Sequence, residues 1–124
     1  MVLVDTSVWI RYLANVSPLA DQLAALLSRD EVLGHELVYG ELLIGDRGGR
    51  QTLLASYARM RQASTVPHTE VVEFARRRRL YGRGVGWIDV HLLASALVDR
   101  NALWTIDPRF AAVAEELGVD YKPE

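Results

Sequence analysis

The sequence predicts an α/β fold of three layers, in which a mostly parallel sheet is covered by helices on both faces. Short apolar runs of strand length alternate along the chain with longer segments of helical periodicity, a pattern typical of parallel sheets with crossover helices. The 124 residues fall within the usual size of one domain. Half of the residues are hydrophobic and about a quarter are charged, which argues against disorder. We therefore expect one compact domain over residues 1–124.

Apolar runs mark the expected strands. The run MVLV at the amino terminus suits a buried parallel strand, and ALWTI near the carboxyl terminus suits a second one. VLG and VDY are shorter and predict a second short strand and a final edge strand. STVPH is read as a loop or a weak strand. The strands are thus expected at residues 1–4, 32–34, 102–106 and 119–121.

Helices are expected after these runs, where apolar residues recur at helical spacing. Ser17 with Pro18 has the pattern of a helix cap followed by a first-turn proline, and Thr69 is expected to cap a later helix that reaches about Tyr81. Glycines end two of the helices. The expected helical segments are 8–14, with Asp5, Thr6 and Ser7 as candidate caps, 18–28, 36–45, 51–63, 69–81, 86–97 and 108–117.

The composition excludes several kinds of chemistry. No cysteine is present, so disulfides, zinc-thiolate sites, iron–sulfur clusters and cysteine nucleophiles are excluded, whereas metals bound through oxygen remain possible. The amino terminus carries no basic segment, and no apolar run approaches the length of a membrane span. We expect a cytoplasmic protein with no membrane contact.

Asp89 lies inside the apolar segment GWIDVHLLASAL, which covers residues 86–97. If this segment is a helix, Leu92 and Leu93 lie on the same face as Asp89, so the carboxylate points along an apolar stripe. A carboxylate removed from water without partners costs on the order of several kcal/mol. Asp89 therefore needs a compensating partner, or it must stay protonated.

Glu41 raises the same question in the segment ELVYGELLIG. Its helical neighbours, such as Val38 and Ile44, are apolar, so this glutamate is also expected to point inward. No lysine lies near Glu41 or Asp89 in the sequence to neutralise them, because the single lysine is Lys122 near the end of the chain. A divalent cation is the simplest common partner for both.

Two further acids follow expected strands. Asp5 and Asp107 lie where a strand ends and a helix begins, which is the edge at which sites form in parallel sheets. Each also has a structural alternative: Asp5 suits a helix cap, and Asp107 before Pro108 is a strong capping pattern. For Asp107 the two interpretations have equal weight.

The motifs together resemble those of the PIN-domain ribonucleases, and in particular the VapC toxins of type II toxin–antitoxin systems. The similarity rests on VDTSVWI at the start, the glutamate of ELVYGELLIG, the aspartate of GRGVGWIDVHLLASAL, and LWTIDPRF near the end. It extends over essentially the whole chain. It implies a single PIN domain over residues 1–124, with a PIN-like α/β/α sandwich.

The resemblance also implies an activity. It points to an endoribonuclease that uses Mg²⁺ or Mn²⁺ to activate water for attack on RNA phosphodiester bonds. It implies a VapB-type antitoxin and a homodimer as partners. A non-catalytic RNA-binding or structural PIN-like module is the alternative. The implied catalytic and metal-binding residues are Asp5, Glu41, Asp89 and Asp107.

The hydroxyls of Thr6, Ser7 and Thr105 lie next to the acids in the sequence and are candidates for orienting carboxylates, water or phosphate. Helix capping and hydrogen bonding at strand ends explain them at least equally well.

Arginine dominates the basic residues, and five of these arginines lie between positions 76 and 83. The usual explanation of such a run is a solvated helix face, and the functional one is contact with phosphate. An RNA that approaches four carboxylates needs a cationic rim. We expect Arg79 and Arg83, which lead into Asp89, to bind RNA.

Overall fold

Three parallel strands form the centre of the protein in the computed structural model, which describes residues 1–124. The strands are β1 (Val2–Val4), β2 (Val32–Leu33) and β3 (Ala102–Trp104), in the order β2-β1-β3. Val2 lies opposite Val32 on one side and Ala102 on the other. Because β1 is the central strand, all three of its residues are buried, as its continuous apolar run predicts.

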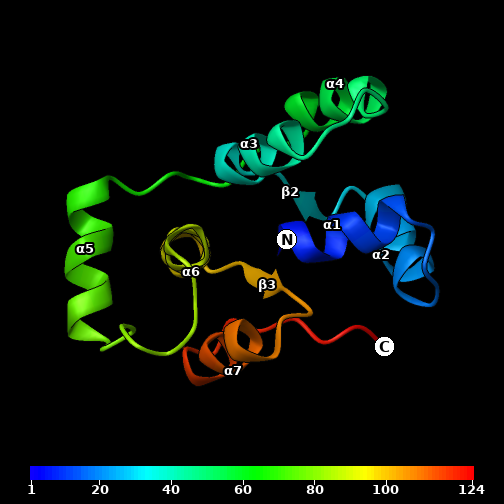
Figure 1. Cartoon of the computed structure of the whole chain (residues 1–124). Helices are drawn as coiled ribbons and strands as arrows, with labels where there is room; N and C mark the ends of the chain where they lie inside the picture. The colour runs from blue at the N-terminus through cyan, green and yellow to red at the C-terminus, as the bar shows by residue number, and fades with distance from the viewer.

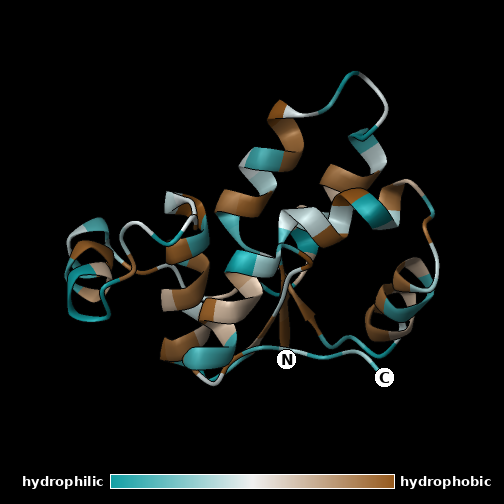
Figure 2. Ribbon diagram, turned by 60° about the horizontal axis from the view of Figure 1, so that its bottom comes forward, coloured by the Kyte–Doolittle hydropathy of each residue, from teal (hydrophilic) through white to brown (hydrophobic).

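Seven helices surround the sheet (Figure 1). Figure 2 shows helices on both sides of the hydrophobic strands, so the expected α/β/α sandwich with a parallel sheet is confirmed. No helix has both the length and the apolar character needed to cross a lipid bilayer. The helices are α1 (Thr6–Leu13), α2 (Leu19–Ser28), α3 (Glu36–Ile44), α4 (Gln51–Arg59), α5 (His68–Arg77), α6 (Trp87–Asp99) and α7 (Pro108–Glu116).

The expected final edge strand at residues 119–121 is not formed. Residues 119–121 contribute only an isolated parallel bridge between Leu103 and Asp120, beside β3. A second isolated bridge joins Gly34 to Gln62, just before the segment read as a loop or weak strand. Single bridges give too few hydrogen bonds for a regular strand, so the sheet ends at β2 and β3.

Two expected caps are wrong. Helix α2 begins at Leu19 with Pro18 in the capping position, and the hydroxyl of Ser17 donates to Asp21 at 3.1 Å instead of capping the helix. Helix α5 begins at His68 with Pro67 in the capping position, so Thr69 lies inside its first turn. In both helices a proline takes the position that the sequence pattern assigns to a hydroxyl residue.

Helices α4 and α5 end earlier than their periodicity predicts. Helix α4 stops at Arg59 because Met60 has extended backbone angles. The carbonyl of Tyr57 accepts from the backbone N–H of Met60 and from the side-chain amide of Gln62, both at 3.1 Å. Helix α5 stops at Arg77, and Arg79 has a left-handed φ of 54°. The turn at Arg79 starts the connection that leads to α6.

A buried histidine joins the helices that carry the candidate acids. His35 precedes α3, and its Nδ1 accepts from the backbone N–H of Leu37 at 3.1 Å. With Nδ1 as acceptor, Nε2 carries the proton and donates to the hydroxyl of Ser95 on α6 at 3.0 Å. The backbone N–H of His35 donates to the hydroxyl of Tyr57 on α4 at 2.8 Å. This network fixes α3 relative to α6, and therefore Glu41 relative to Asp89.

The neutral state of His35 predicts a pH dependence of stability. Burial lowers the pKa of His35 below its usual 6.5, so the folded chain keeps it neutral at pH values where the unfolded chain takes up a proton. Its stabilising effect is complete above about pH 6.5 and declines as the pH falls below that value. His35→Asn retains a capping side chain but loses the bond to Ser95, so we expect a loss of roughly 1–3 kcal/mol at pH 7.5.

Urea unfolding between pH 5 and pH 7.5 measures this effect. The difference in unfolding free energy between the wild type and His35→Asn should shrink at the acid end, and other titrating groups cancel in that difference. His68→Asn, which removes an exposed histidine, is the matched control, and its difference from the wild type should not shrink at the acid end. A constant difference across the pH range would show that His35 is not held neutral.

Candidate functional site

Asp5 is a buried carboxylate directly after β1, with 5% of its surface exposed. It occupies the capping position of α1, but its side chain makes no capping hydrogen bond. Its Oδ2 instead accepts from the hydroxyl of Ser7 at 2.7 Å and from the hydroxyl of Thr105 at 2.8 Å. Thr105 directly follows β3, so the side chain of Asp5 is held between the ends of two neighbouring strands.

Glu41 is exposed, and the expectation that it points into the protein is wrong. Val38 and Leu42 form the buried face of α3. The Oε1 atom of Glu41 accepts from the hydroxyl of Thr6 at 2.6 Å, and Thr6 is the residue after Asp5. This bond directs Glu41 toward the edge at which Asp5 lies, although its carboxylate remains in contact with solvent.

Asp89 lies in the first turn of α6, and its Oδ2 accepts from the backbone N–H of Gly86 at 3.0 Å. Burial raises the pKa of Asp89 to about 6, although the bond from Gly86 opposes this shift. The negative charges of three nearby acids contribute to the same rise in its pKa; they are Asp5, Glu41 and Asp107. Asp89 is therefore close enough to the other three acids for their charges to oppose its ionisation.

Asp107 caps α7, as the capping interpretation expects. Its Oδ1 accepts from the backbone N–H of Arg109 at 2.9 Å and from that of Phe110 at 3.4 Å. The backbone N–H of Asp107 donates to the hydroxyl of Thr105 at 3.1 Å. Thr105 thus links Asp107 to Asp5, and capping places Asp107 at the site without preventing a second role.

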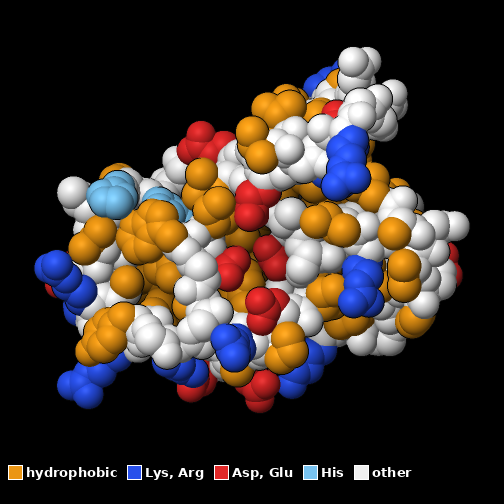
Figure 3. Space-filling view, in the orientation of Figure 1, with side chains coloured by type: hydrophobic (Ala, Val, Ile, Leu, Met, Phe, Trp, Pro, Cys, Tyr) orange, Lys and Arg blue, Asp and Glu red, His pale blue; other side chains and the backbone are white.

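Acidic side chains gather around a depression in the middle of one face (Figure 3). None of the four candidate acids forms an ion pair; the ion pairs of the protein involve other carboxylates. No three histidine or carboxylate side chains converge closely enough to hold one ion as they stand. The atoms available to bind a metal are nonetheless all carboxylate oxygens, which are the ligands that Mg²⁺ and Mn²⁺ prefer. The chemistry fits such an ion, but a three-ligand cage is not preformed.

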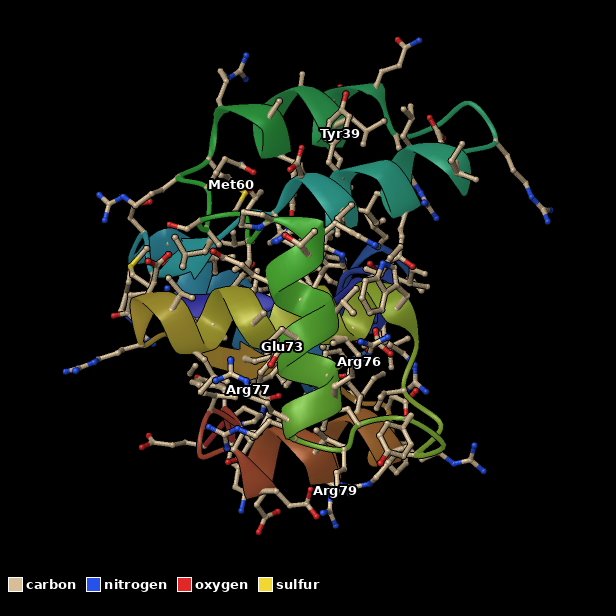
Figure 4. The ribbon with its side chains drawn as sticks, turned by 90° about the vertical axis from the view of Figure 1, so that its left-hand side faces the viewer. Tyr39, Met60, Glu73, Arg76, Arg77 and Arg79 are labelled. Carbon is tan, nitrogen blue, oxygen red and sulfur yellow. The ribbon has the colours of Figure 1, made fainter.

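The two arginines expected to bind RNA have different surroundings. Arg83 makes a two-point contact with Glu116 on α7, at 2.7 and 3.0 Å. Arg79 makes no ion pair and lies beyond the carboxyl-terminal end of α5 (Figure 4). Arg77 lies near Glu73 on the outer face of α5, at 3.8 Å. The Arg83 contact fastens the connection before α6 to α7.

Arg109 is a cation near the site that the sequence analysis overlooked. It is exposed in the first turn of α7, two residues after Asp107. Its side chain passes over Gly84, where an added Cβ would lie 2.5 Å from the Cδ of Arg109, and Gly84 has a φ of 81°. The glycine in GRGVG therefore leaves room for this guanidinium. Its position so soon after Asp107 was the signal in the sequence.

Comparisons with known proteins agree with this arrangement. The model of the PIN domain family matches residues 2–116. Two curated relatives are named Ribonuclease VapC32, from Mycobacterium tuberculosis strains CDC 1551 / Oshkosh and ATCC 25618 / H37Rv. Each is 44% identical to this chain over 120 residues, which is 96% of this chain and 94% of the relative.

The raised pKa of Asp89 predicts that its charge destabilises the metal-free protein. The carboxyl group is easier to ionise in the unfolded chain, so stability declines as the pH rises through about 6. Asp89→Asn keeps an oxygen for Gly86 and removes the charge. We expect this variant to be more stable by roughly 1–2 kcal/mol at pH 8 in EDTA, after allowance for partial solvation.

Thermal unfolding at pH 5 and pH 8 measures this effect, with the exposed Asp21→Asn as the control variant. The advantage of Asp89→Asn should be full at pH 8 and roughly half as large at pH 5, because it builds up between the ordinary pKa of an aspartate, about 4, and the raised pKa of about 6. A lower melting temperature at pH 8 would instead show that the charge of Asp89 stabilises the fold.

Proposed function

The chain belongs to the PIN-domain family and, within it, to the VapC proteins, and from this premise we propose that it is a toxin that cleaves RNA with Mg²⁺ or Mn²⁺. The observation that supports the proposal most is that hydroxyls at one edge of the sheet hold Asp5, Glu41 and Asp107 near Asp89, without an ion pair to any of the four acids. Unbalanced carboxylates on one face attract a divalent cation.

The residues that would hold the ion are Asp5, Glu41, Asp89 and Asp107. When bound, a divalent ion makes its water more acidic and stabilises the charge that builds on the phosphate. The hydroxyls of Ser7 and Thr105 both donate to the Oδ2 atom of Asp5, so Oδ1 is the oxygen left for an ion. Thr6 has the corresponding role toward Glu41.

The proposal extends to partners and place of action. A VapB-type antitoxin would hold the toxin inactive until it is needed, and two copies of the toxin would form a homodimer. The antitoxin would suit the acidic depression best if it inserted an arginine, whose guanidinium pairs with carboxylates at two points. The RNA substrate implies action in the cytoplasm, by a single PIN domain over residues 1–124.

Metal dependence tests the proposed activity directly. RNA cleavage should need added Mg²⁺ or Mn²⁺, stop in EDTA, and leave 5′-phosphate and 3′-hydroxyl ends. Asp5→Asn and Asp89→Asn should lose nearly all activity, because each replaces a charged carboxylate ligand by a neutral amide. Thr105→Val should lose roughly 10- to 100-fold, because it releases the oxygen of Asp5 that it orients. Asp21→Asn is the control and should cleave like the wild type.

Undiminished cleavage in excess EDTA would contradict the proposal, and so would full activity of the Asp89→Asn variant. Products with cyclic phosphate ends would show that the 2′-hydroxyl of the RNA attacks, rather than water.

Arg79 and Arg83 are proposed to contact RNA phosphates, and the ion pair with Glu116 offsets part of the charge of Arg83. Arg79→Ala should therefore weaken RNA binding more than Arg83→Ala does. Each lost phosphate contact should flatten the salt dependence of binding by about one counterion. Affinity measured at several salt concentrations tests this, with Arg77→Ala as the control. Identical salt dependence in all three variants would mean that the cluster is only a solvated helix face.

A further inference from the structure

Trp87 is the exposed member of the three tryptophans. Trp9 and Trp104 are core residues with 1% and 2% of their surface exposed, whereas Trp87 is 44% exposed. It is the first residue of α6 and lies two residues before Asp89. An indole left open to water forgoes the free energy that burial would provide. Its exposure beside the candidate site therefore suggests a ligand.

Two histidines hold the indole in position. The ring of His68, from the start of α5, lies 5.4 Å from that of Trp87 at an interplanar angle of 66°. The ring of His91, one turn further along α6, lies 5.0 Å away at 88°. Both are edge-to-face contacts, a favoured arrangement of aromatic rings. They restrict the indole while a large part of its surface stays open.

The histidines and the carboxylates are visible on the same face of the protein. Figure 3 shows histidine side chains on this face, and hydrophobic side chains lie between them and the acidic depression. A ligand that covers both features places a flat apolar group on the indole and, when the carboxylates hold the proposed divalent cation, negative charge beside that ion. A single-stranded RNA has this combination, because unstacked bases alternate with phosphates along its backbone.

We propose that Trp87, held between His68 and His91, is a stacking platform for an unpaired RNA base next to the phosphodiester that is cleaved. This inference rests on the proposed function and adds a positioning residue to it. Stacking on Trp87 would hold the RNA strand at the edge of the acidic depression, where phosphate repulsion otherwise weakens binding. It would favour single-stranded segments over duplex RNA, whose bases are already stacked.

Two substitutions separate stacking from simple apolar contact. Trp87→Phe keeps an aromatic face, and Trp87→Leu keeps an apolar side chain without one. The affinity of a short fluorescein-labelled oligoadenylate is measured by anisotropy in EDTA, so that the RNA stays intact. Trp87→Leu should bind roughly 5- to 100-fold more weakly than the wild type, and Trp87→Phe should stay within about threefold. With Mg²⁺ present, the leucine variant should show a raised KM and a nearly unchanged kcat.

Tyr81→Leu is the matched control, because Tyr81 is a more exposed aromatic residue, at 70%, in the connection before α6. It should bind oligoadenylate like the wild type. Quenching of tryptophan fluorescence by the RNA should be strong in the wild type and largely lost in Trp87→Phe, because Trp9 and Trp104 are buried. Equal melting temperatures establish that the variants are folded.

Equal RNA affinity of the leucine variant, the phenylalanine variant and the wild type would overturn the platform. The proposal would also be overturned if Trp87→Leu bound RNA like the wild type but no longer self-associated in sedimentation. That result would assign Trp87 to an interface between copies. Failure of the platform is distinct from failure of the proposed function. In the first case Trp87→Leu cleaves like the wild type while Asp89→Asn does not; in the second the wild type does not cleave, whatever the affinities show.

Discussion

Burial of the Asp5 carboxylate at the end of the central strand costs free energy, which the hydroxyls of Ser7 and Thr105 offset by donating to it. Thr105 also accepts from the backbone N–H of Asp107, and Thr6 donates to Glu41. Thr6 and Ser7 follow β1, and Thr105 follows β3, which pairs with β1. Three of the four acids are therefore positioned by one hydrogen-bonded edge of the sheet, and Asp89 is positioned by the amino-terminal turn of α6.

The acids repel each other, and no arginine or lysine pairs with them. The pKa of Asp89, raised to about 6, expresses this cost together with that of burial. A protein selected only for stability would replace such a residue, so a destabilised cluster at a strand edge indicates a functional site. A divalent cation would relieve the repulsion, and the single-stranded RNA proposed for Trp87 would approach across the same face.

The sequence predicts much of this arrangement because its signals are local. The apolar runs locate the strands, and the position of Asp5 and Asp107 after strands brings them to one edge. The face of α3 is not predictable, because apolar residues surround that helix and both buried Leu42 and exposed Ile44 fit its pattern. The pairs Arg83–Glu116 and His35–Ser95 join residues that are 33 and 60 positions apart, so only the folded chain reveals them.

We propose that the four carboxylates hold a divalent cation. Anomalous diffraction from crystals grown with and without Mn²⁺ tests it most directly, because manganese is located without reference to activity or to RNA. We predict an anomalous peak among the carboxylates, with the Oδ1 atom of Asp5 and the carboxylate of Asp89 as ligands. Crystals saturated with Mn²⁺ that show no peak at this edge, with the four acids still bonded only to their present protein partners, would show that the carboxylates hold no such ion.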